Sequence, residues 1–442
     1  MLIHDVVVQE CEKGAVGLFA QDNGSYLLKV PFGMGGMAPA EALAVLYKSF
    51  SIFRRTHHSH TLLAKLDGLE SHSTQGLDDS EGGTSFCDAL GLDELFERAD
   101  PLHLLSLCER RAQQPWNVSR QLERHLHLAL YDNSGAPYLE RAPGSRRETL
   151  RGSSDIVGLY CLIAEDFYLR FLDVEPVRVW GNFSADVQAM AANFRHRYLA
   201  ANDSLYGEDP QQCLRTRQHL QYLLREINRS TSLRNSDYRR LHETLDRYLH
   251  GGRTTEQHQG QVWGVNNFWA VWESVCLHHA AGSRGLESFL TCEFEHMPAV
   301  LSSPELTNRW LKYRAALYHH NGLERRPDLV LNTQSQVKVI DFKYYRTPPA
   351  QRYTQNLDAE LVRLEKDFRN LEIYGLLTHN YLLRETGQGT KKIALEFWLP
   401  GREEQHTPIV HEPAWMHPIA VVRLCTPQVM RDYSQLYNVH GL

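Results

Sequence analysis

The sequence predicts an α/β protein (α+β overall) with a β-rich N-terminal part, a mainly helical middle and a C-terminal part that contains both strands and helices. Three observations indicate this class. Short apolar runs between turn residues open the chain, helical apolar spacing dominates 88–250, and two strand-like runs lie between helical patterns in the last third. Domains hold about 100–200 residues, so the 442-residue chain suggests two or three of them. We expect the segments 1–70, 71–255 and 256–442.

The N-terminal segment is expected to begin with strands and to continue into a helix. Its apolar runs are separated by Gly, Asp and Asn turn signals and lie at 6–8, 16–19 and 26–30. Apolar residues recur at helical spacing over 39–53, and Pro39 suits the first turn, where its missing N–H costs nothing. A Gly/Ser/Asp-rich passage over 70–85 then predicts a linker or a long loop.

The middle segment carries apolar residues at i, i+3 and i+4, which predicts helices over 102–111, 157–171, 184–201 and 214–227. A short strand is expected at 177–180. A polar break at 250–255 ends this segment. The β-rich part and the helical region carry no catalytic motif, so we expect them to provide docking surfaces for a partner.

The bulk composition is that of an ordinary globular protein, with 42% hydrophobic and 23% charged residues. The sequence shows no basic-then-apolar leader and no run of about 18 apolar residues, so we expect a cytoplasmic protein without a membrane partner. The cysteines form no CxxC pair, which favours reduced thiols over a zinc site or disulfides. A net charge of −6 argues against strong non-specific DNA binding by the chain alone.

Residues 267–276 form a predicted helix that places an acid beside an apolar stripe. Trp269 and Trp272 belong to this stripe, and Glu273 lies next to it. An acid on a buried aromatic face is costly unless it is paired or binds a cation. Glu273 is therefore a candidate metal ligand, and a buried acid paired with an arginine is the alternative.

Two strand-like runs, 325–331 and 337–345, flank a short polar loop and predict a hairpin. Residues two apart on a strand share a face, so Asp341 and Lys343 are expected to point the same way. The return of the second strand can also set Asp341 beside Asp328 of the first. A surface ion pair between Asp341 and Lys343 on an edge hairpin is the alternative interpretation.

Two neighbouring carboxylates repel each other unless a cation lies between them, and Mg²⁺ prefers such hard oxygen ligands. We expect Asp328 and Asp341 to bind Mg²⁺, for which Mn²⁺ can substitute. Glu273 and the backbone carbonyl of Phe342 are candidate further ligands. The cation would polarise a phosphodiester and acidify the attacking water. Lys343 would orient that water or neutralise charge in the transition state.

This pattern resembles the motif of the PD-(D/E)XK nucleases, because Pro327-Asp328 is followed by Asp341-Phe342-Lys343. The helix that carries Glu273 matches the upstream acidic helix of that fold. The resemblance covers about residues 260–400. It implies a restriction-endonuclease-like core, in which a mixed sheet is flanked by helices.

The downstream segment 367–374 is similar to the QxxxY helix of RecB-like members, with Asn370 in place of Gln and Tyr374 in its expected position. A predicted strand at 393–399 would complete the order helix, strands, helix, strand. Asn370 and Tyr374 are expected either to contact the substrate strand or to make structural hydrogen bonds. Arg325 and Arg326 are expected phosphate contacts, with simple surface solvation as the alternative.

Within this superfamily, the Trp-Glu helix and the β-rich N-terminal part resemble the McrC and LlaJI-type restriction endonuclease subunits. The resemblance implies a Mg-dependent endodeoxyribonuclease of a prokaryotic antiphage defence system. It also implies DNA and an AAA+ McrB-like NTPase as partners, and allows an oligomer within that complex. The chain has no GxxxxGK[ST] loop, so the energy for translocation would come from the partner. The acidic net charge fits recruitment to DNA by such a partner.

Two other functions remain open from the sequence. A stand-alone RecB-like DNA repair nuclease would cleave DNA with metal alone, without a nucleotide. A non-catalytic scaffold would keep the nuclease fold only to bind a partner or DNA. The presence of Asp328, Asp341 and Lys343 together argues against the scaffold, because a decayed site would have lost at least one of them.

Overall fold

The computed structural model describes residues 6–11, 14–21, 26–59, 70–71, 85–92, 95, 126, 129–138, 147–171, 184–200, 202–207, 209–231, 236–251, 260–320, 323–344, 358–385, 391–409 and 419–439. Within these residues the fold is mixed α/β, with nine α-helices and two six-stranded mixed sheets. The expected α/β class is therefore confirmed. No helix in the described part is both long enough and apolar enough to cross a membrane.

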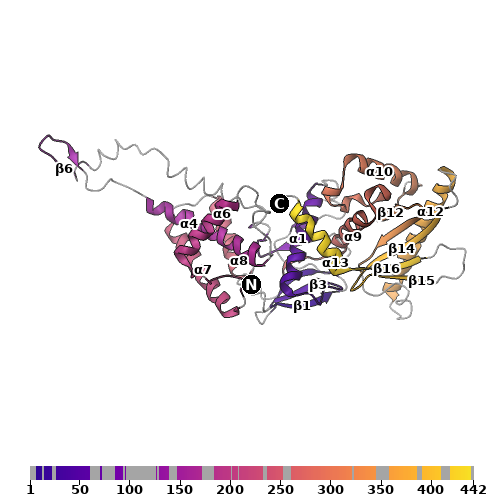
Figure 1. Cartoon of the computed structure of the whole chain (residues 1–442), viewed down its shortest axis with the longest axis horizontal. Helices are drawn as coiled ribbons and strands as arrows, with labels where there is room; N and C mark the ends of the chain where they lie inside the picture. Colours follow the sequence, from indigo (N-terminus) through magenta and orange to yellow (C-terminus); the bar gives the residue numbers. More distant parts are fainter. Residues whose placement is uncertain are drawn as a thin grey trace. The chain divides into compact units, whose positions relative to one another are not determined.

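The chain forms two compact units, coloured along the sequence in Figure 1. One comprises Leu90–Thr254, and the other combines Asp5–Ala89 with Thr255–Leu442. The N-terminal residues therefore share a unit with the C-terminal part, whereas the sequence suggested a separate segment 1–70. The physical reason is a strand pairing, because β8 (Gly260–Val265) lies antiparallel to β2 (Val16–Ala20).

The first unit is helical, as the apolar spacing predicted. Its helices are α4 (Arg147–Asp166), α6 (Ser184–Tyr198), α7 (Pro210–Ser230) and α8 (Ser236–Leu249), and α4 continues into the π-helix η4 (Phe167–Phe171). A small hairpin is formed by β6 (Leu130–Tyr131) and β7 (Pro137–Tyr138). Helices expected over 157–171, 184–201 and 214–227 are confirmed, and the elements expected at 102–111 and 177–180 lie outside the described residues.

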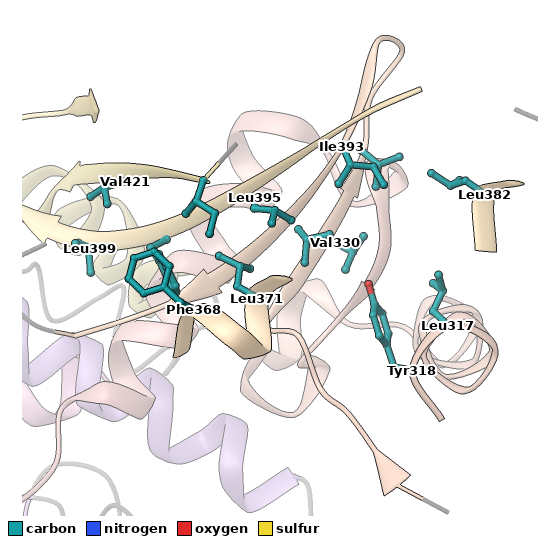
Figure 2. Close-up of a cluster of buried hydrophobic side chains, with 14 residues drawn as sticks. Leu317, Tyr318, Val330, Phe368, Leu371, Leu382, Ile393, Leu395, Leu399 and Val421 are labelled. Carbon is teal, nitrogen blue, oxygen red and sulfur yellow. The ribbon is translucent and has the colours of Figure 1, made fainter. Parts of the chain in front are cut away.

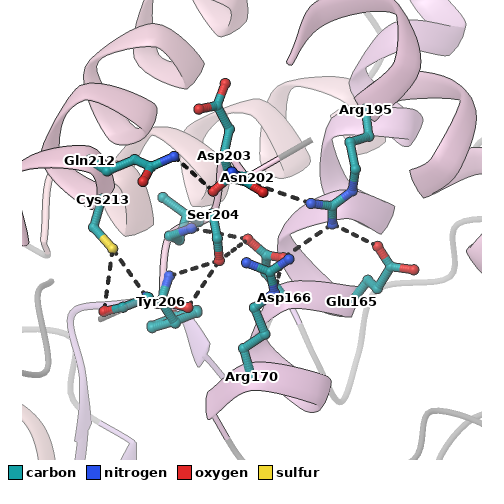
Figure 3. Close-up of polar contacts among 12 residues, drawn as sticks. Glu165, Asp166, Arg170, Arg195, Asn202, Asp203, Ser204, Tyr206, Gln212 and Cys213 are labelled. Atoms are coloured by element: carbon teal, nitrogen blue, oxygen red, sulfur yellow. Dashed lines mark hydrogen bonds and ion pairs between the residues drawn. The ribbon is translucent and has the colours of Figure 1, made fainter. Parts of the chain in front are cut away.

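A buried carboxylate joins the helices of this unit (Figure 3). Asp166 accepts hydrogen bonds from the Ser204 hydroxyl and from the backbone N–H of Leu205, both at 3.0 Å. Arg195 pairs with Asp166 at 3.2 Å and with Glu165 at 2.9 Å. Since these donors satisfy the buried carboxylate, the network is a structural link between α4, α6 and the turn at 202–207.

One sheet of the second unit has the strand order β1-β3-β2-β8-β5-β4. Besides β2 and β8 it contains β1 (Val6–Cys11), β3 (Tyr26–Pro31), β4 (Glu70–Ser71) and β5 (Ser85–Asp88). The three strands predicted near the N-terminus are confirmed, and so is the helix, α1 (Pro39–Ser59). That helix packs against α13 (Thr426–Val439), where Glu41 and Arg431 form an ion pair at 2.8 Å.

The other sheet has the order β15-β16-β14-β13-β12-β9. Its strands are β9 (Phe289–Cys292), β12 (Leu329–Asn332), β13 (Gln336–Phe342), β14 (Lys392–Gly401), β15 (Gln405–Ile409) and β16 (Ile419–Cys425). Strands β9, β12 and β13 are antiparallel neighbours, while β13, β14 and β16 run parallel. The predicted hairpin is confirmed as β12–β13. Strand β12 begins only at Leu329, because Pro327 has no N–H to donate to a ladder.

Four helices accompany this sheet: α9 (Trp269–Arg284), α10 (Pro304–Tyr318), α12 (Asp358–Glu385) and α13. Between α10 and α12 lies the minor pair β10 (His319–His320) and β11 (Leu323–Glu324). The helices predicted at 267–276 and 367–374 and the strand predicted at 393–399 are confirmed within α9, α12 and β14.

One face of the sheet carries the core that α10 and α12 cover (Figure 2). Val337 and Val339 of β13 belong to this cluster together with Leu371 of α12 and Leu395 of β14. Because side chains alternate along a strand, Asp341 continues the same face beyond Val339. The sheet thus delivers an acidic side chain at the end of an apolar core.

Candidate metal centre

Asp328 and Asp341 lie at the open end of the β12–β13 hairpin, and each is 6% exposed. Leu329 pairs with Ile340, so the register continued by one residue sets Asp328 opposite Asp341. The backbone N–H of Phe342 donates a hydrogen bond to Asp328 Oδ2. Burial first, and then the charges of Asp341 and Glu293, raise the pKa of Asp328 well above its usual range. The two acids predicted from the motif therefore interact directly.

Lys343 follows β13 immediately and stands between two acids. Its ammonium lies 3.0 Å from Asp341 Oδ2 and 3.3 Å from Asp367 Oδ1. Asp367 belongs to α12, so this pair also joins the helix to the end of the strand. Asp341 and Lys343 are on one face, as predicted. Because Asp341 is buried, their contact is not the exposed edge pair of the alternative interpretation.

Glu273, in the first turns of α9, faces the same acids. Its side chain is 12% exposed, and its Oε2 is buried without a hydrogen bond among the described residues. Burial, followed by the charges of Asp328 and Glu293, raises the pKa of Glu273 well above its usual range, while the charge of Lys343 lowers it. The acid that the sequence placed beside tryptophans thus lies at the hairpin end. Its Oε2 lies 3.7 Å from Nδ1 of His296, and the arginine pairing considered for it is not seen within the described residues.

Two further residues at this point were missed by the sequence analysis, Glu293 and His296. One ligand atom from each, and one from Glu273, lie within 4.8 Å of one another. Glu293 directly precedes the 3₁₀ turn η7 (Phe294–His296), and His296 ends it. A hydrogen bond of the turn runs from the N–H of His296 to Glu293 O at 3.0 Å. Side chains three apart align on a 3₁₀ turn. A Glu-x-x-His pattern directly after a strand was the available signal.

The turn is held in place from both sides. The backbone N–H of Glu293 donates to Asp328 O at 2.9 Å, which couples the turn to the start of β12. Arg314 of α10 pairs with both oxygens of Glu295, at 2.9 and 3.0 Å, and donates to Cys292 O at 2.7 Å. Glu295 is therefore paired with arginine, while ligand atoms of Glu293 and His296 lie close to one of Glu273.

The backbone of Phe342 is also at the site. In a strand the N–H and C=O of one residue point to the same neighbouring strand. The N–H of Phe342 donates to Asp328, so the carbonyl of Phe342 points toward Asp328 as well. This carbonyl is the backbone group that the sequence analysis named as a candidate metal ligand.

The predicted nucleic-acid contacts divide into two pairs. Arg326 lies near the acids, because its charge lowers the pKa of Glu293 against the raising effect of burial. The Tyr374 hydroxyl donates to Arg326 O at 3.5 Å, and burial with the charges of Asp341 and Asp328 raises the pKa of Tyr374 to about 12. Arg325 is half-buried, and its backbone N–H donates to Tyr318 O at 3.1 Å. Asn370 lies on α12, one turn before Tyr374, and is half-buried.

The donor set fits a divalent cation. Glu273, Glu293, Asp328 and Asp341 converge in a largely buried volume, and burial raises the pKa of three of them. Buried carboxylates of this kind must be protonated, paired or bound to a cation. Lys343 and Arg326 offset part of the charge. A buried carboxylate oxygen without a hydrogen bond, on Glu273, is the observation that favours a cation.

No protein-family model matches the chain, and no curated protein matches its sequence.

Proposed function

We propose that this chain is a metal-dependent DNA endonuclease with a PD-(D/E)XK core. One observation carries the proposal: Asp328, Asp341 and Lys343 meet at one end of a hairpin, with Glu273 beside them. The element order also supports it: α9 precedes the antiparallel strands β9, β12 and β13, with α10 inserted between β9 and β12, and α12 and the parallel strand β14 come after them.

The chemistry proposed is hydrolysis of a phosphodiester. Mg²⁺, held by Asp328, Asp341, Glu273 and the Phe342 carbonyl, would polarise the phosphate and acidify a water. The N–H of Phe342 orients one oxygen of Asp328 and leaves the other available. Lys343, held between two carboxylates, places a positive charge where negative charge develops on the phosphate. The largely buried setting strengthens each of these interactions.

DNA binding is proposed for the residues around this end of the hairpin. Arg325 and Arg326 directly precede the Pro327-Asp328 motif, so phosphates that reach the acids would pass their guanidinium groups. Tyr374 and Asn370 lie on one side of α12, four residues apart. The hydroxyl of Tyr374 donates a hydrogen bond to the backbone of Arg326, so we assign Tyr374 a structural role that holds the segment before Asp328 in place. Asn370 is then the residue of the two that we assign to contact with the DNA strand.

The proposal extends to a partner. The acidic net charge gives little general attraction for DNA, and the sequence has no P-loop, so an AAA+ McrB-like NTPase would load the nuclease onto DNA in an antiphage restriction complex. The helical unit and the N-terminal sheet are the surfaces proposed for that contact.

The test uses the purified full chain with supercoiled plasmid and Mg²⁺ or Mn²⁺, with and without EDTA, and with and without a P-loop NTPase that co-purifies with it. Cleavage should require the cation and fall by at least about 10²-fold in Asp341→Asn and in Lys343→Met. Lys392→Met is the matched control, since that exposed lysine lies opposite Gln336 at the other end of β13. Cleavage by Asp341→Asn at the wild-type rate would overturn the proposal, as would no cleavage under any of these conditions. A requirement for the NTPase separates the restriction complex from a stand-alone repair nuclease.

A further inference from the structure

We infer that Glu273, Glu293 and His296 form a cation position of their own beside the Asp328–Asp341 pair, and that it takes a first-row transition metal such as Mn²⁺ in preference to Mg²⁺. The site follows from the geometry of these three side chains. Only the role of the cation in DNA cleavage rests on the proposed nuclease function.

The donors are already gathered for one ion. Their ligand atoms lie within 4.8 Å of one another, with 3.7 Å between His296 Nδ1 and Glu273 Oε2. Ligands at about 2.0–2.2 Å from a cation lie at most about 4.4 Å apart. A shift of a few tenths of an ångström in flexible glutamate side chains therefore brings all three onto a single metal.

The three donors come from two rigid elements. Glu273 lies on α9. Glu293 is the N-cap residue of the turn η7 and His296 is its last residue, and the turn aligns their side chains. The imidazole of His296 is 1% exposed and lies near the rings of Phe53 and Trp269, with ring centroids 6.5 and 6.1 Å away. The imidazole therefore lies in a buried, largely aromatic environment.

A second, independent observation points to a ligand. Glu273 Oε2 is buried and accepts no hydrogen bond from a described residue, although it faces the histidine. Arg314 does not supply this partner, because its guanidinium group donates hydrogen bonds to both carboxylate oxygens of Glu295. A cation between Glu273 and Glu293 would give the buried carboxylate oxygen the partner that these contacts do not supply.

The chemistry of the donors selects the metal. Imidazole nitrogen suits Zn²⁺, Fe²⁺ and the later first-row metals, whereas Mg²⁺ prefers an all-oxygen shell. Two carboxylates and one imidazole make a mixed set of oxygen and nitrogen ligands, and Mn²⁺ can bind both kinds. The neighbouring Asp328–Asp341 pair offers only oxygen and lacks this preference.

Pulsed electron paramagnetic resonance of Mn²⁺ added to the full chain tests the assignment, because it detects the nuclear spin of a directly bound histidine nitrogen. The wild type should show this nitrogen coupling, and His296→Gln should lose it. Calorimetric titration should show that Mn²⁺ binds at least about tenfold more weakly to His296→Gln. Glu293→Gln should weaken binding similarly and keep the nitrogen coupling of the Mn²⁺ that still binds. This half-buried position provides the test if the histidine variant does not fold.

Two exposed residues give matched controls. His250→Gln and Glu287→Gln replace side chains that are 47% and 85% exposed, and both should bind Mn²⁺ as the wild type does. Bound Mn²⁺ without nitrogen coupling, or the absence of Mn²⁺ binding, would overturn the inference. Mn²⁺ bound through His296 in a chain that never cleaves DNA would refute only the nuclease. Cleavage by a wild type without nitrogen coupling would refute only this site.

Discussion

Asp328 accepts a hydrogen bond from the backbone N–H of Phe342, so the residue before β12 is fastened to the last residue of β13. The same carboxylate is a proposed metal ligand. Its structural role and its charge can therefore be separated by two substitutions at one position.

Asp328→Asn should keep this hydrogen bond, because an amide oxygen can accept from the same N–H. Asp328→Ala leaves that buried N–H without its acceptor, so its free energy of unfolding should be about 1–3 kcal/mol lower than that of Asp328→Asn. Urea denaturation in EDTA measures the difference. Both variants should lose DNA cleavage. Equal stability of the two variants would show that the hydrogen bond contributes nothing.

The stability of the metal-free chain should fall as the pH rises, because burial and neighbouring acids raise the pKa of Glu273 and Asp328. In the unfolded chain these carboxyl groups have a pKa of about 4. Between that pH and their raised pKa in the folded state, the folded chain binds more protons than the unfolded chain, so the free energy of unfolding falls as the pH rises. Each such group contributes a loss of about 1.4 kcal/mol per pH unit in that window. Thermal unfolding in EDTA between pH 5 and 8 measures it.

The variant Glu273→Gln provides the control for that titration, since it removes one of the shifted groups. Its stability relative to the wild type should increase with pH in EDTA. Saturating Mn²⁺ should reverse the order at high pH, because the cation binds the ionised form of the wild-type site. A difference between the two chains that does not change with pH would contradict the expectation.

Lys338 and Glu396 form a pair on adjacent strands at 2.5 Å, and Glu396 also accepts from Trp398 Nε1 at 2.9 Å. Lys338→Met leaves a buried carboxylate without its cation, so we expect a loss of about 3–5 kcal/mol in unfolding free energy. Adding Glu396→Gln should restore most of it, because the amide is neutral and can still accept from Trp398. Denaturant titration of the single and double variants checks this, with the exposed Lys392→Met as control. A double variant no more stable than Lys338→Met would refute the pair's role.

Gly17 and Gly264 face each other where β2 pairs with β8. At Gly17 the φ is +143°, and a Cβ there would lie 2.1 Å from the backbone oxygen of Trp263. Gly17→Ala should therefore lower the free energy of unfolding by at least about 2 kcal/mol. Gly36→Ala is the control, because a Cβ there meets nothing within 4 Å. Thermal unfolding compares them, and equal midpoints would argue against the β2–β8 pairing.

The elements of the site followed from local patterns. Alternation from Val337 to Lys343 predicted both a strand and the shared face of Asp341 and Lys343, because the two-residue period is a property of the strand itself. The helix of Glu273 was predicted for the same kind of reason, since its apolar stripe repeats at helical spacing.

Other partners at the site could not be predicted in this way. Asp367 lies on α12 and pairs with Lys343, which follows β13. The two residues belong to different elements, so no helical or strand periodicity in the sequence relates them. Glu293 and His296 lie on an irregular turn whose position depends on Arg314 of a later helix. Boundaries also depended on context, since the strand predicted from Arg325 begins at Leu329.

By itself the sequence determined many of the strands and helices, among them the β12–β13 hairpin and the helix of Glu273, and it set Asp341 and Lys343 on one face, because these depend on neighbours a few residues away. Only the tertiary structure decided that β8 joins the N-terminal strands and that Glu273, Glu293 and His296 converge. Those distances are set by packing between elements far apart in the chain, where side-chain fit and burial, and not local periodicity, select the arrangement.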